Sequence, residues 1–272
     1  MSIPTEQLLS DVSLFPDPET EFIILSSNTT VDKLVIGEAE AGYVPRYLAG
    51  IITEHSVSTS VDLVGLQVWR GALLLADYIL AQPSLLAGKH VLEVAAGTGL
   101  TSLVAGMFAR TVVSTDVDRG DILPLLRRNA GRNREALDGC DFSVAELDFF
   151  WDCWPEELRT QITDCDVILA ADVVYDKDIT RHFFKTLTSL LSLGPKVALI
   201  AIEKRLHAGE EGEIVAPNYE IFLKSLSDLN KSRLNQNTRV KVSSVKLDFT
   251  KSLQYTRVSE LNLFKIESIN EI

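Results

Sequence analysis

The stretch from His90 to Leu100 reads H-V-L-E-V-A-A-G-T-G-L, and the rest of the chain is organised around it. Its apolar first half predicts a β-strand, and Gly97 and Gly99 predict a tight turn that ends this strand. Beyond the turn, apolar residues recur at the i, i+3 and i+4 spacing of one helix face. A second apolar strand, residues 111–115, then ends at Asp116. Strand, glycine turn, helix and an acidic strand end together predict the nucleoside-binding half of an open α/β sheet.

Two side chains indicate which nucleoside this loop binds. A dinucleotide-binding loop has the pattern Gly-x-Gly-x-x-Gly, whereas this chain has Ser102 at the third glycine position. Glu93, at the end of the first strand, would repel a pyrophosphate, which otherwise binds well at a helix N-terminus. A carboxylate suits a ligand with an ammonium and a sulfonium group, and S-adenosylmethionine has both. We therefore predict S-adenosylmethionine as the cofactor and disfavour a nicotinamide dinucleotide.

Composition and charge narrow the class of protein. The chain has 272 residues and a formal net charge of −12, which suits one large α/β domain. No apolar run approaches the roughly 18 residues of a membrane span, and residues 1–11 lack the pattern of a signal peptide, so we expect an intracellular protein that does not bind a membrane. The cysteines, Cys140, Cys153 and Cys165, have neither disulfide-framework nor metal-site spacing.

The negative charge disfavours direct binding to nucleic acid and suits a basic partner, although it could also serve only to keep the protein soluble. One predicted helix, residues 121–135, nevertheless has a basic outer face. This face is made by Arg127, Arg128, Arg132 and Arg134. A nucleic-acid patch is one interpretation of these arginines, and a solvated helix surface is the interpretation that we prefer.

The chain divides by pattern into three parts. Residues 1–20 are polar and contain prolines, and they predict a flexible lead-in. Residues 21–63 predict a small β-rich N-terminal layer, because short strand patterns alternate there with Gly, Asn and Ser. These patterns stand at 22–25, 33–36 and 51–52. Residues 64–272 predict the cofactor-binding domain.

Strand and helix patterns alternate within this last part. Strands are expected at about 91–94, 111–115, 142–147, 166–171 and 196–202, and helices at about 66–83, 100–108, 121–135, 179–190 and 218–229. Two more strands, 239–248 and 259–266, follow without a helix between them and should pair antiparallel. The expected fold class is α/β: a mostly parallel, Rossmann-like seven-strand sheet with helices on both faces and one antiparallel strand.

Five motifs carry a resemblance to a known family. They are G-L-Q-V-W-R-G-A (65–72), V-L-E-V-A-A-G-T-G-L (91–100), S-T-D-V-D (114–118), E-L-D-F (146–149) and D-V-V-Y (172–175). Together they resemble the protein-lysine methyltransferases of methyltransferase family 16, with the seven-strand sheet of class I methyltransferases, most clearly over residues 63–202. The chain departs from the family at Ala95, where the first glycine of motif I usually stands, and at Phe149, where tryptophan is usual, although Trp151 is close by.

The resemblance implies a site residue by residue. The cofactor-binding residues would be Trp69, Glu93, Ala95, Gly97, Gly99, Asp116, Asp148, Phe149 and Ala171, and the catalytic residues would be Asp172 and Tyr175. Asp116 would accept hydrogen bonds from both ribose hydroxyls, Asp148 would accept one from the adenine amine, and Glu93 would lie near the methionyl ammonium and sulfonium. Trp69 would pack beside the methionyl end of the cofactor or anchor its helix in the core.

The expected reaction is methyl transfer from S-adenosylmethionine to the ε-amine of a lysine in a protein, which leaves S-adenosylhomocysteine and needs no metal. Free lysine has a pKa of about 10.4, and burial beside a sulfonium would lower it. Asp172 would then aim the amine, and Tyr175 would wall its channel. The rival functions are a nucleic-acid or small-molecule N-methyltransferase, disfavoured because no Asn/Asp-Pro-Pro-aromatic motif follows the fourth strand, and a catalytically silent cofactor-binding module.

The expected partner is a basic protein, with nucleic-acid-binding proteins and chaperones as candidates, and the chain is expected to be a monomer. The resemblance favours the nucleus over the cytoplasm.

Overall fold

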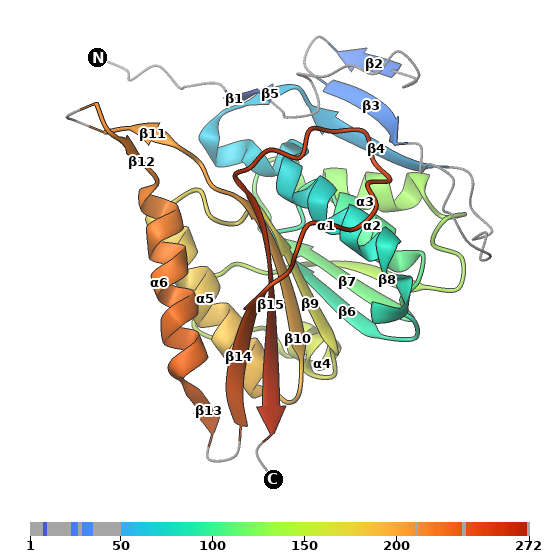
Figure 1. The fold of residues 1–272 in the computed structure, drawn as a ribbon. Coiled ribbons are helices and arrows are strands. Elements are labelled where there is room, and N and C mark those ends of the chain that lie inside the picture. The colour runs from blue at the N-terminus through green and yellow to red at the C-terminus, as the bar shows by residue number, and fades with distance from the viewer. Residues whose placement is uncertain are drawn as a thin grey trace.

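An eight-stranded sheet of order β13-β14-β15-β10-β9-β6-β7-β8 forms the centre of the computed structural model (Figure 1). The structure describes residues 8–9, 23–26, 29–34, 50–209, 212–235 and 238–270. The strands of this sheet are β6 His90–Val94, β7 Thr111–Asp116, β8 Asp141–Glu146, β9 Val167–Ala171, β10 Val197–Glu203, β13 Arg233–Asn235, β14 Thr238–Ser244 and β15 Leu261–Asn270. Their bounds lie close to the predicted ones, except that β13 was not predicted.

The direction of the strands confirms the predicted fold class. β8, β7, β6, β9 and β10 pair in parallel, whereas β15 pairs antiparallel with both β10 and β14. These seven strands form the mostly parallel sheet with one reversed strand, and β13 extends its edge. The chain winds from β6 to β7 and β8, then returns to β9 on the other side of β6. Open α/β sheets bind their ligands where the winding reverses, at the carboxyl ends of the strands.

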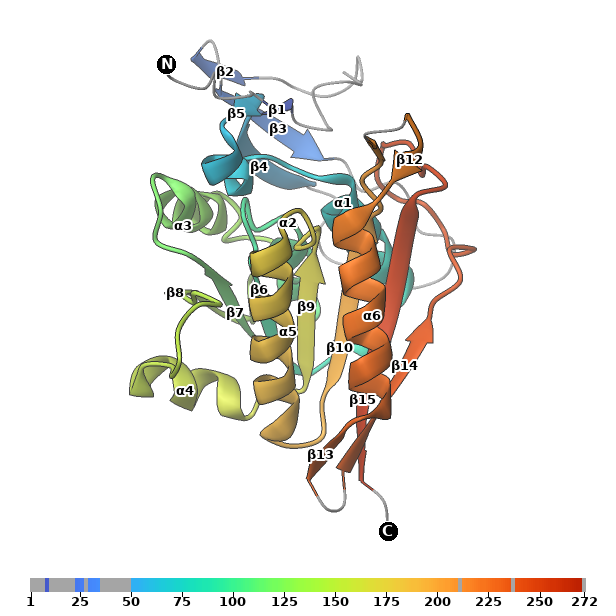
Figure 2. The same ribbon diagram turned by 90° about the vertical axis from the view of Figure 1, so that its left-hand side faces the viewer.

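In the described part of the chain, six α-helices pack around this sheet. They are α1 Arg70–Ala81, α2 Leu100–Gly106, α3 Ile122–Arg132, α4 Glu156–Thr163, α5 Lys177–Ser192 and α6 Pro217–Lys231. Leu92 and Ile168 belong to an apolar core on the face covered by α4, α5 and α6, whereas Val91 and Leu169 face the core beneath α1 and α2 (Figure 2). Neighbouring residues of β6 and β9 thus alternate between two cores, as expected of central strands covered on both faces.

Local signals explain where two of these helices begin and why one was missed. Asp176 caps α5, because its Oδ1 accepts the N–H groups of Asp178 and Ile179 at 2.8 and 2.9 Å, as capping carboxylates do. Pro217 opens α6, where its missing N–H costs no helical hydrogen bond. α4 buries only Leu158 and Ile162, so its apolar pattern is too short to have predicted a helix.

Helix α1, which falls within the helix predicted at about 66–83, is buried on nearly all sides. Every residue from Leu73 to Ile79 is buried. By length and composition, the segment Val61–Ala81 is also apolar enough to cross a membrane, so the expectation that no run approaches that length was wrong. In the fold this segment comprises a 3-10 helix, η1 Val61–Leu66, and α1 in the core.

A buried ion pair joins α1 to residues 245–260, the segment that connects β14 to β15. Asp77 is fully buried, and its Oδ1 accepts the N–H groups of Ser252 and Leu253 at 2.8 Å each. Its Oδ2 lies 2.9 Å from Nη2 of Arg257. The connecting segment is therefore held on α1 by a charge that is fully hydrogen-bonded, as a buried charge must be.

The described strands of the N-terminal region form two small sheets. β2 Ile23–Ser26, β3 Thr29–Leu34 and β4 Ile51–Ser56 are antiparallel neighbours, and β1 Leu8–Leu9 pairs with β5 Ser58–Thr59. The predicted strand at 33–36 overlaps only the end of β3, and Phe22, Val35 and Ile36 lie outside the described residues. Of the predicted lead-in, only Leu8 and Leu9 are described.

Two asparagines of α3 attach β4 to the α/β core. Their side-chain amides bond the backbone N–H and C=O groups of β4 as a neighbouring strand would. The Asn133 amide accepts the Ile52 N–H at 2.8 Å and donates to the Ile52 carbonyl at 2.7 Å. Asn129 makes the same two bonds to Glu54, each at 2.9 Å. Because Asn129 and Asn133 are one helical turn apart, they match residues two apart on the strand.

The arginines of α3 reinforce this junction. Nη2 of Arg128 and Nη2 of Arg132 lie 2.8 and 2.5 Å from the carboxylate oxygens of Glu54, whose side chain is nearly buried. All four arginines of the basic helix face are exposed, as the interpretation of a solvated surface predicts, and Arg128 and Arg132 in addition pair with Glu54. They neutralise a carboxylate that the junction with β4 buries.

Candidate functional site

Two adjoining cavities open at the carboxyl ends of β6, β7, β8 and β9. The larger is lined by Trp69, Glu93, Ala95, Gly97, Asp116, Ala171, Asp172 and Tyr175, among others, and the smaller adds Asp148 and Phe149. Ala95, Asp116 and Tyr175 belong to the walls of both. The structure thus gathers every predicted site residue except Gly99, which stands outside the two walls as the first residue before α2.

The glycine loop after β6 has an unusual backbone. Ala95, Gly97 and Gly99 have φ angles of 51°, 55° and 83°, the left-handed region that favours glycine. A Cβ on Gly97 would lie 2.7 Å from the carbonyl oxygen of Gly65, and one on Gly99 would collide with Leu126. At Ala95 a methyl group is accommodated at a cost of about 1–2 kcal/mol. This conformation explains why glycine is usual at that position of motif I.

Glu93 is a buried carboxyl group in the wall of the larger cavity. Only 1% of it is exposed, and the Ser102 hydroxyl donates a hydrogen bond to its Oε2. Burial raises the pKa of Glu93 to about 8, although the bonds from Ser102 and Thr101 oppose this shift. Ser102 stands where a dinucleotide-binding loop has its third glycine, and in this structure it is a hydrogen-bond partner of Glu93. A cationic group in the cavity would stabilise the ionised form of Glu93.

Asp116 connects the glycine loop to the end of β7. Its Oδ2 accepts the Gly97 N–H and its Oδ1 accepts the Val117 N–H, both at 2.7 Å. Burial raises the pKa of Asp116 to about 6, and these two backbone bonds lower it. Each carboxylate oxygen has a second lone pair, so Asp116 can still accept two hydroxyl donors from a ribose. Arg119, which sequence reasoning missed, lines both cavities beside it.

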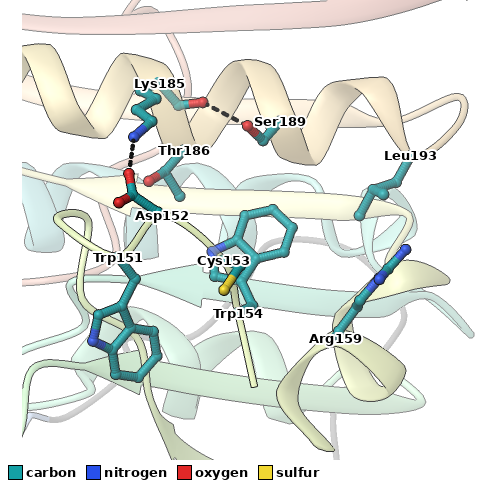
Figure 3. A pocket seen from close by; sticks show the side chains of 9 residues that line it. All are labelled: Trp151, Asp152, Cys153, Trp154, Arg159, Lys185, Thr186, Ser189 and Leu193. Carbon is teal, nitrogen blue, oxygen red and sulfur yellow. Dashed lines mark hydrogen bonds and ion pairs between the residues drawn. The ribbon is translucent and has the colours of Figure 1, made fainter. Parts of the chain in front are cut away.

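The acidic and aromatic pair after β8 lines the smaller cavity. Oδ1 of Asp148 accepts the Phe150 N–H at 2.9 Å, and Phe149 packs edge-on against Phe183 with 5.6 Å between ring centroids. Trp151 lies elsewhere, in the wall of a separate surface hollow with Trp154 (Figure 3). Trp151 therefore does not replace the tryptophan that the family usually has at position 149.

Asp172 is held in place from two sides. It has a φ of 50°. Its Oδ2 accepts the N–H of Gly71 and its Oδ1 accepts the N–H of Glu203, both at 2.7 Å. Gly71 lies in the first turn of α1, so Asp172 caps the positive end of a helix that is distant in sequence. The carboxylate is thus anchored at the cavity wall by backbone donors from α1 and β10.

An ionic cluster, which sequence reasoning missed, surrounds Asp172. The Arg205 guanidinium lies over the Trp69 ring, 4.9 Å from its centroid, and 3.8 Å from Oδ2 of Asp172. Glu203 binds Arg205 at 3.3 Å and Arg70 at 3.0 Å. The available sequence signals were the acid that ends β10 and the arginine next to Trp69. The ring of Trp69 and the carboxylate of Asp172 thus face a cation already in this structure.

Tyr175 stands at the mouth of both cavities. Its side chain is 40% exposed, and its backbone oxygen accepts a bond from Nδ2 of Asn218 at 2.7 Å. Partial burial and the nearby Asp116 raise the pKa of Tyr175 to about 12. Its hydroxyl is therefore protonated at neutral pH, and the ring forms an aromatic wall beside Asp172.

Comparison with known proteins places most of the chain in the family that the motifs resemble. A family model described as "Lysine methyltransferase" matches residues 52–227. Methyltransferase-like protein 22 of Mus musculus is 37% identical over 248 residues, which cover 85% of this chain and 62% of that protein. Protein-lysine N-methyltransferase EFM6 of Saccharomyces cerevisiae is 33% identical over 53% of this chain and 65% of its own length. The chain thus spans less than two thirds of the length of these relatives.

A solved structure shares the fold. SMU.776, crystallised in complex with SAH, superposes with a TM-score of 0.51 over 93% of this chain and 57% of its own chain, at 13% sequence identity. A similarity at this level concerns the arrangement of the sheet and helices alone.

Proposed function

Because this chain belongs to the lysine methyltransferase family, we propose that it transfers a methyl group from S-adenosylmethionine to the ε-amine of a lysine in a protein substrate. The observation that carries the proposal is the convergence of three acids on one crevice. Glu93 and Asp116 are buried beside the glycine loop, and Asp172 is anchored at the wall they share. The family and the names of its relatives supply the substrate class.

The residues of the cavities fit this cofactor. Glu93 would bind the ammonium of the methionyl part. Burial raises the pKa of Glu93, and the positive charge of the ammonium would stabilise its ionised form. Asp116 would bind the ribose hydroxyls, and Asp148 with Phe149 would bind the adenine. When bound, S-adenosylmethionine supplies a methyl group on a positively charged sulfur.

The acceptor side of the crevice is made by Asp172, Tyr175 and Trp69. Asp172 would accept a hydrogen bond from the lysine amine and so direct its lone pair, while the two aromatic rings exclude water. Asp172 can do this with little reorganisation, because two backbone N–H groups already hold its carboxylate. Positioning of this kind is a large part of what an enzyme contributes to a displacement reaction.

A protein acceptor is favoured over a nucleobase. The net charge of −12 opposes a phosphate backbone, and Val173 and Val174 stand where base-specific amino-methyltransferases carry two prolines. We further propose a basic substrate protein, with nucleic-acid-binding proteins and chaperones as candidates, a monomeric enzyme, and a nuclear or cytoplasmic site of action with the nucleus preferred.

The test is methyl transfer from labelled S-adenosylmethionine into cell extract, divided between nuclease and protease treatment. Label that protease removes, and that acid hydrolysis recovers as methyl-lysine, would support the proposal. Label that only nuclease removes would overturn it. Asp172→Ala should bind the cofactor nearly as tightly as the original chain and transfer much less label; cofactor binding without transfer by the original chain itself would indicate a silent module.

A further inference from the structure

Exposed apolar side chains gather around the mouth of the crevice. Among the described residues, the large apolar side chains with the greatest exposure are Val61 49%, Phe150 51%, Tyr175 40%, Leu206 46%, Ile214 74% and Leu223 42%. Leu223 lies on α6. The other five, which we name the apolar rim, lie on η1, on the segments that follow β8, β9 and β10, and on β12 Ile214–Val215.

Part of the apolar rim lies on the segment that follows β10, which starts beside Trp69 and Asp172. After β10, the chain passes Arg205 and forms a hairpin of β11 His207–Ala208 and β12. This hairpin lies beyond the end of the sheet, above α6 (Figures 1 and 2). At its base, Arg205 contacts Trp69 and Asp172. The hairpin is therefore connected through Arg205 to the residues that would bind the acceptor lysine.

Scattered exposed apolar residues are normal on a soluble protein, but their concentration on one edge marks an interaction surface. Here the concentration coincides with the carboxyl ends of the parallel strands. Ile214, the most exposed of them at 74%, lies on β12, which pairs with β11.

The charge at the mouth indicates the character of the partner. Besides its partial burial, three carboxylates, Asp116, Asp176 and Asp62, raise the pKa of Tyr175, and Arg119 lowers it. Asp62, next to Val61 of the rim, also lines the larger cavity. Four of the charged residues that line the larger cavity are acids, Asp62, Glu93, Asp116 and Asp172, against the single Arg119. This acidic lining complements a cationic surface.

We propose that the apolar rim and the β11–β12 hairpin form the docking surface for a folded protein that presents its acceptor lysine among apolar and basic side chains. This inference rests on the proposed function. Leu206 and Ile214 are exposed and line neither cavity, so a folded substrate can contact them in addition to filling the crevice.

Two exposed rim residues outside both cavities allow a clean test. Ile214→Ser and Leu206→Ser should slow the initial labelling of extract protein by about five- to tenfold at low extract concentration, and the rate should recover at high concentration. Their affinity for S-adenosylmethionine, measured by calorimetry, should be unchanged. Leu223→Ser is the matched control, because Leu223 is similarly exposed but lies off the rim.

Equal labelling by Ile214→Ser, Leu206→Ser and the control would overturn the docking surface while leaving the proposed function intact. A loss that persists at every extract concentration, or one that accompanies weaker cofactor binding, would also overturn it. If the original chain labels no protein, the proposed function fails first and the docking surface with it.

Discussion

Asp172 and Gly71, which are 101 residues apart, meet at the N-terminus of α1: Oδ2 of Asp172 accepts the Gly71 N–H at 2.7 Å. A Cβ on Gly71 would lie 2.6 Å from that same oxygen. Glycine is therefore required at position 71 for the carboxylate to approach the helix. The position of Asp172, which would aim the acceptor amine, thus depends on the lack of a side chain at Gly71 of α1.

Gly71→Ala should therefore move the Asp172 carboxylate and lower methyl transfer by about a hundredfold, since misplacement by about an ångström can cost that much. Its affinity for S-adenosylmethionine should change little. Gly131→Ala is the control, because a Cβ there has no neighbour within 4 Å and α3 should gain stability. Turnover by Gly71→Ala within a few-fold of the original would show that the position of Asp172 is unimportant.

Asp116→Ala should weaken the binding of S-adenosylmethionine by about 1–3 kcal/mol, the usual loss when a charged acceptor is removed. The loss of the Gly97 bond would add to it by loosening the glycine loop. Calorimetry on the folded variant measures this change. Asp118→Ala, at an exposed neighbouring residue that lines neither cavity, should bind normally; equal affinities for the two variants would remove Asp116 from the site.

The stability of the ligand-free protein should fall as the pH rises from about 6 to 8. The pKa of Glu93 is raised to about 8 by burial, so the folded chain binds a proton that the unfolded chain has already released. Stability is therefore lost as the pH rises. An acid whose pKa is lowered on folding would instead lose its contribution to stability as the pH falls. Asp116, with a pKa of about 6, contributes in the same direction at lower pH.

Urea unfolding at pH 6 and pH 8 tests this dependence on Glu93. Glu93→Gln should lose less stability than the original chain over this interval, because its side chain does not titrate. If both proteins lose stability equally between these pH values, Glu93 is not the titrating group.

Arg257→Ala should destabilise the protein by about 3–5 kcal/mol, because it leaves the fully buried Asp77 without its counter-charge. Thermal or urea unfolding measures the loss. The control is Arg181→Ala, whose partner Asp178 lies with it on the surface, and it should change stability by less than about 1 kcal/mol. Similar values for both variants would mean that the 245–260 segment does not depend on this ion pair.

The sequence by itself determined the layout of the fold. Period-2 and period-3.6 patterns are properties of neighbouring residues, so β6, the glycine loop, α2 and β7 could be placed from residues 90–116 alone. The parallel order then brought Glu93, Asp116, Asp148 and Asp172 to one edge of the sheet, because parallel strands end on the same side. α4 and β13 were missed, since their apolar patterns are too short.

Only the tertiary structure decided which groups the buried polar side chains contact. Asp172 binds Gly71, Asp77 binds Arg257, and Asn129 of α3 binds Glu54 of β4, across separations of 75 to 180 residues. A hydrogen bond needs its two atoms within about 3 Å, and that distance depends on how whole elements pack. No local pattern carries this information, so the sequence could name the groups of the site but not the partners that hold them.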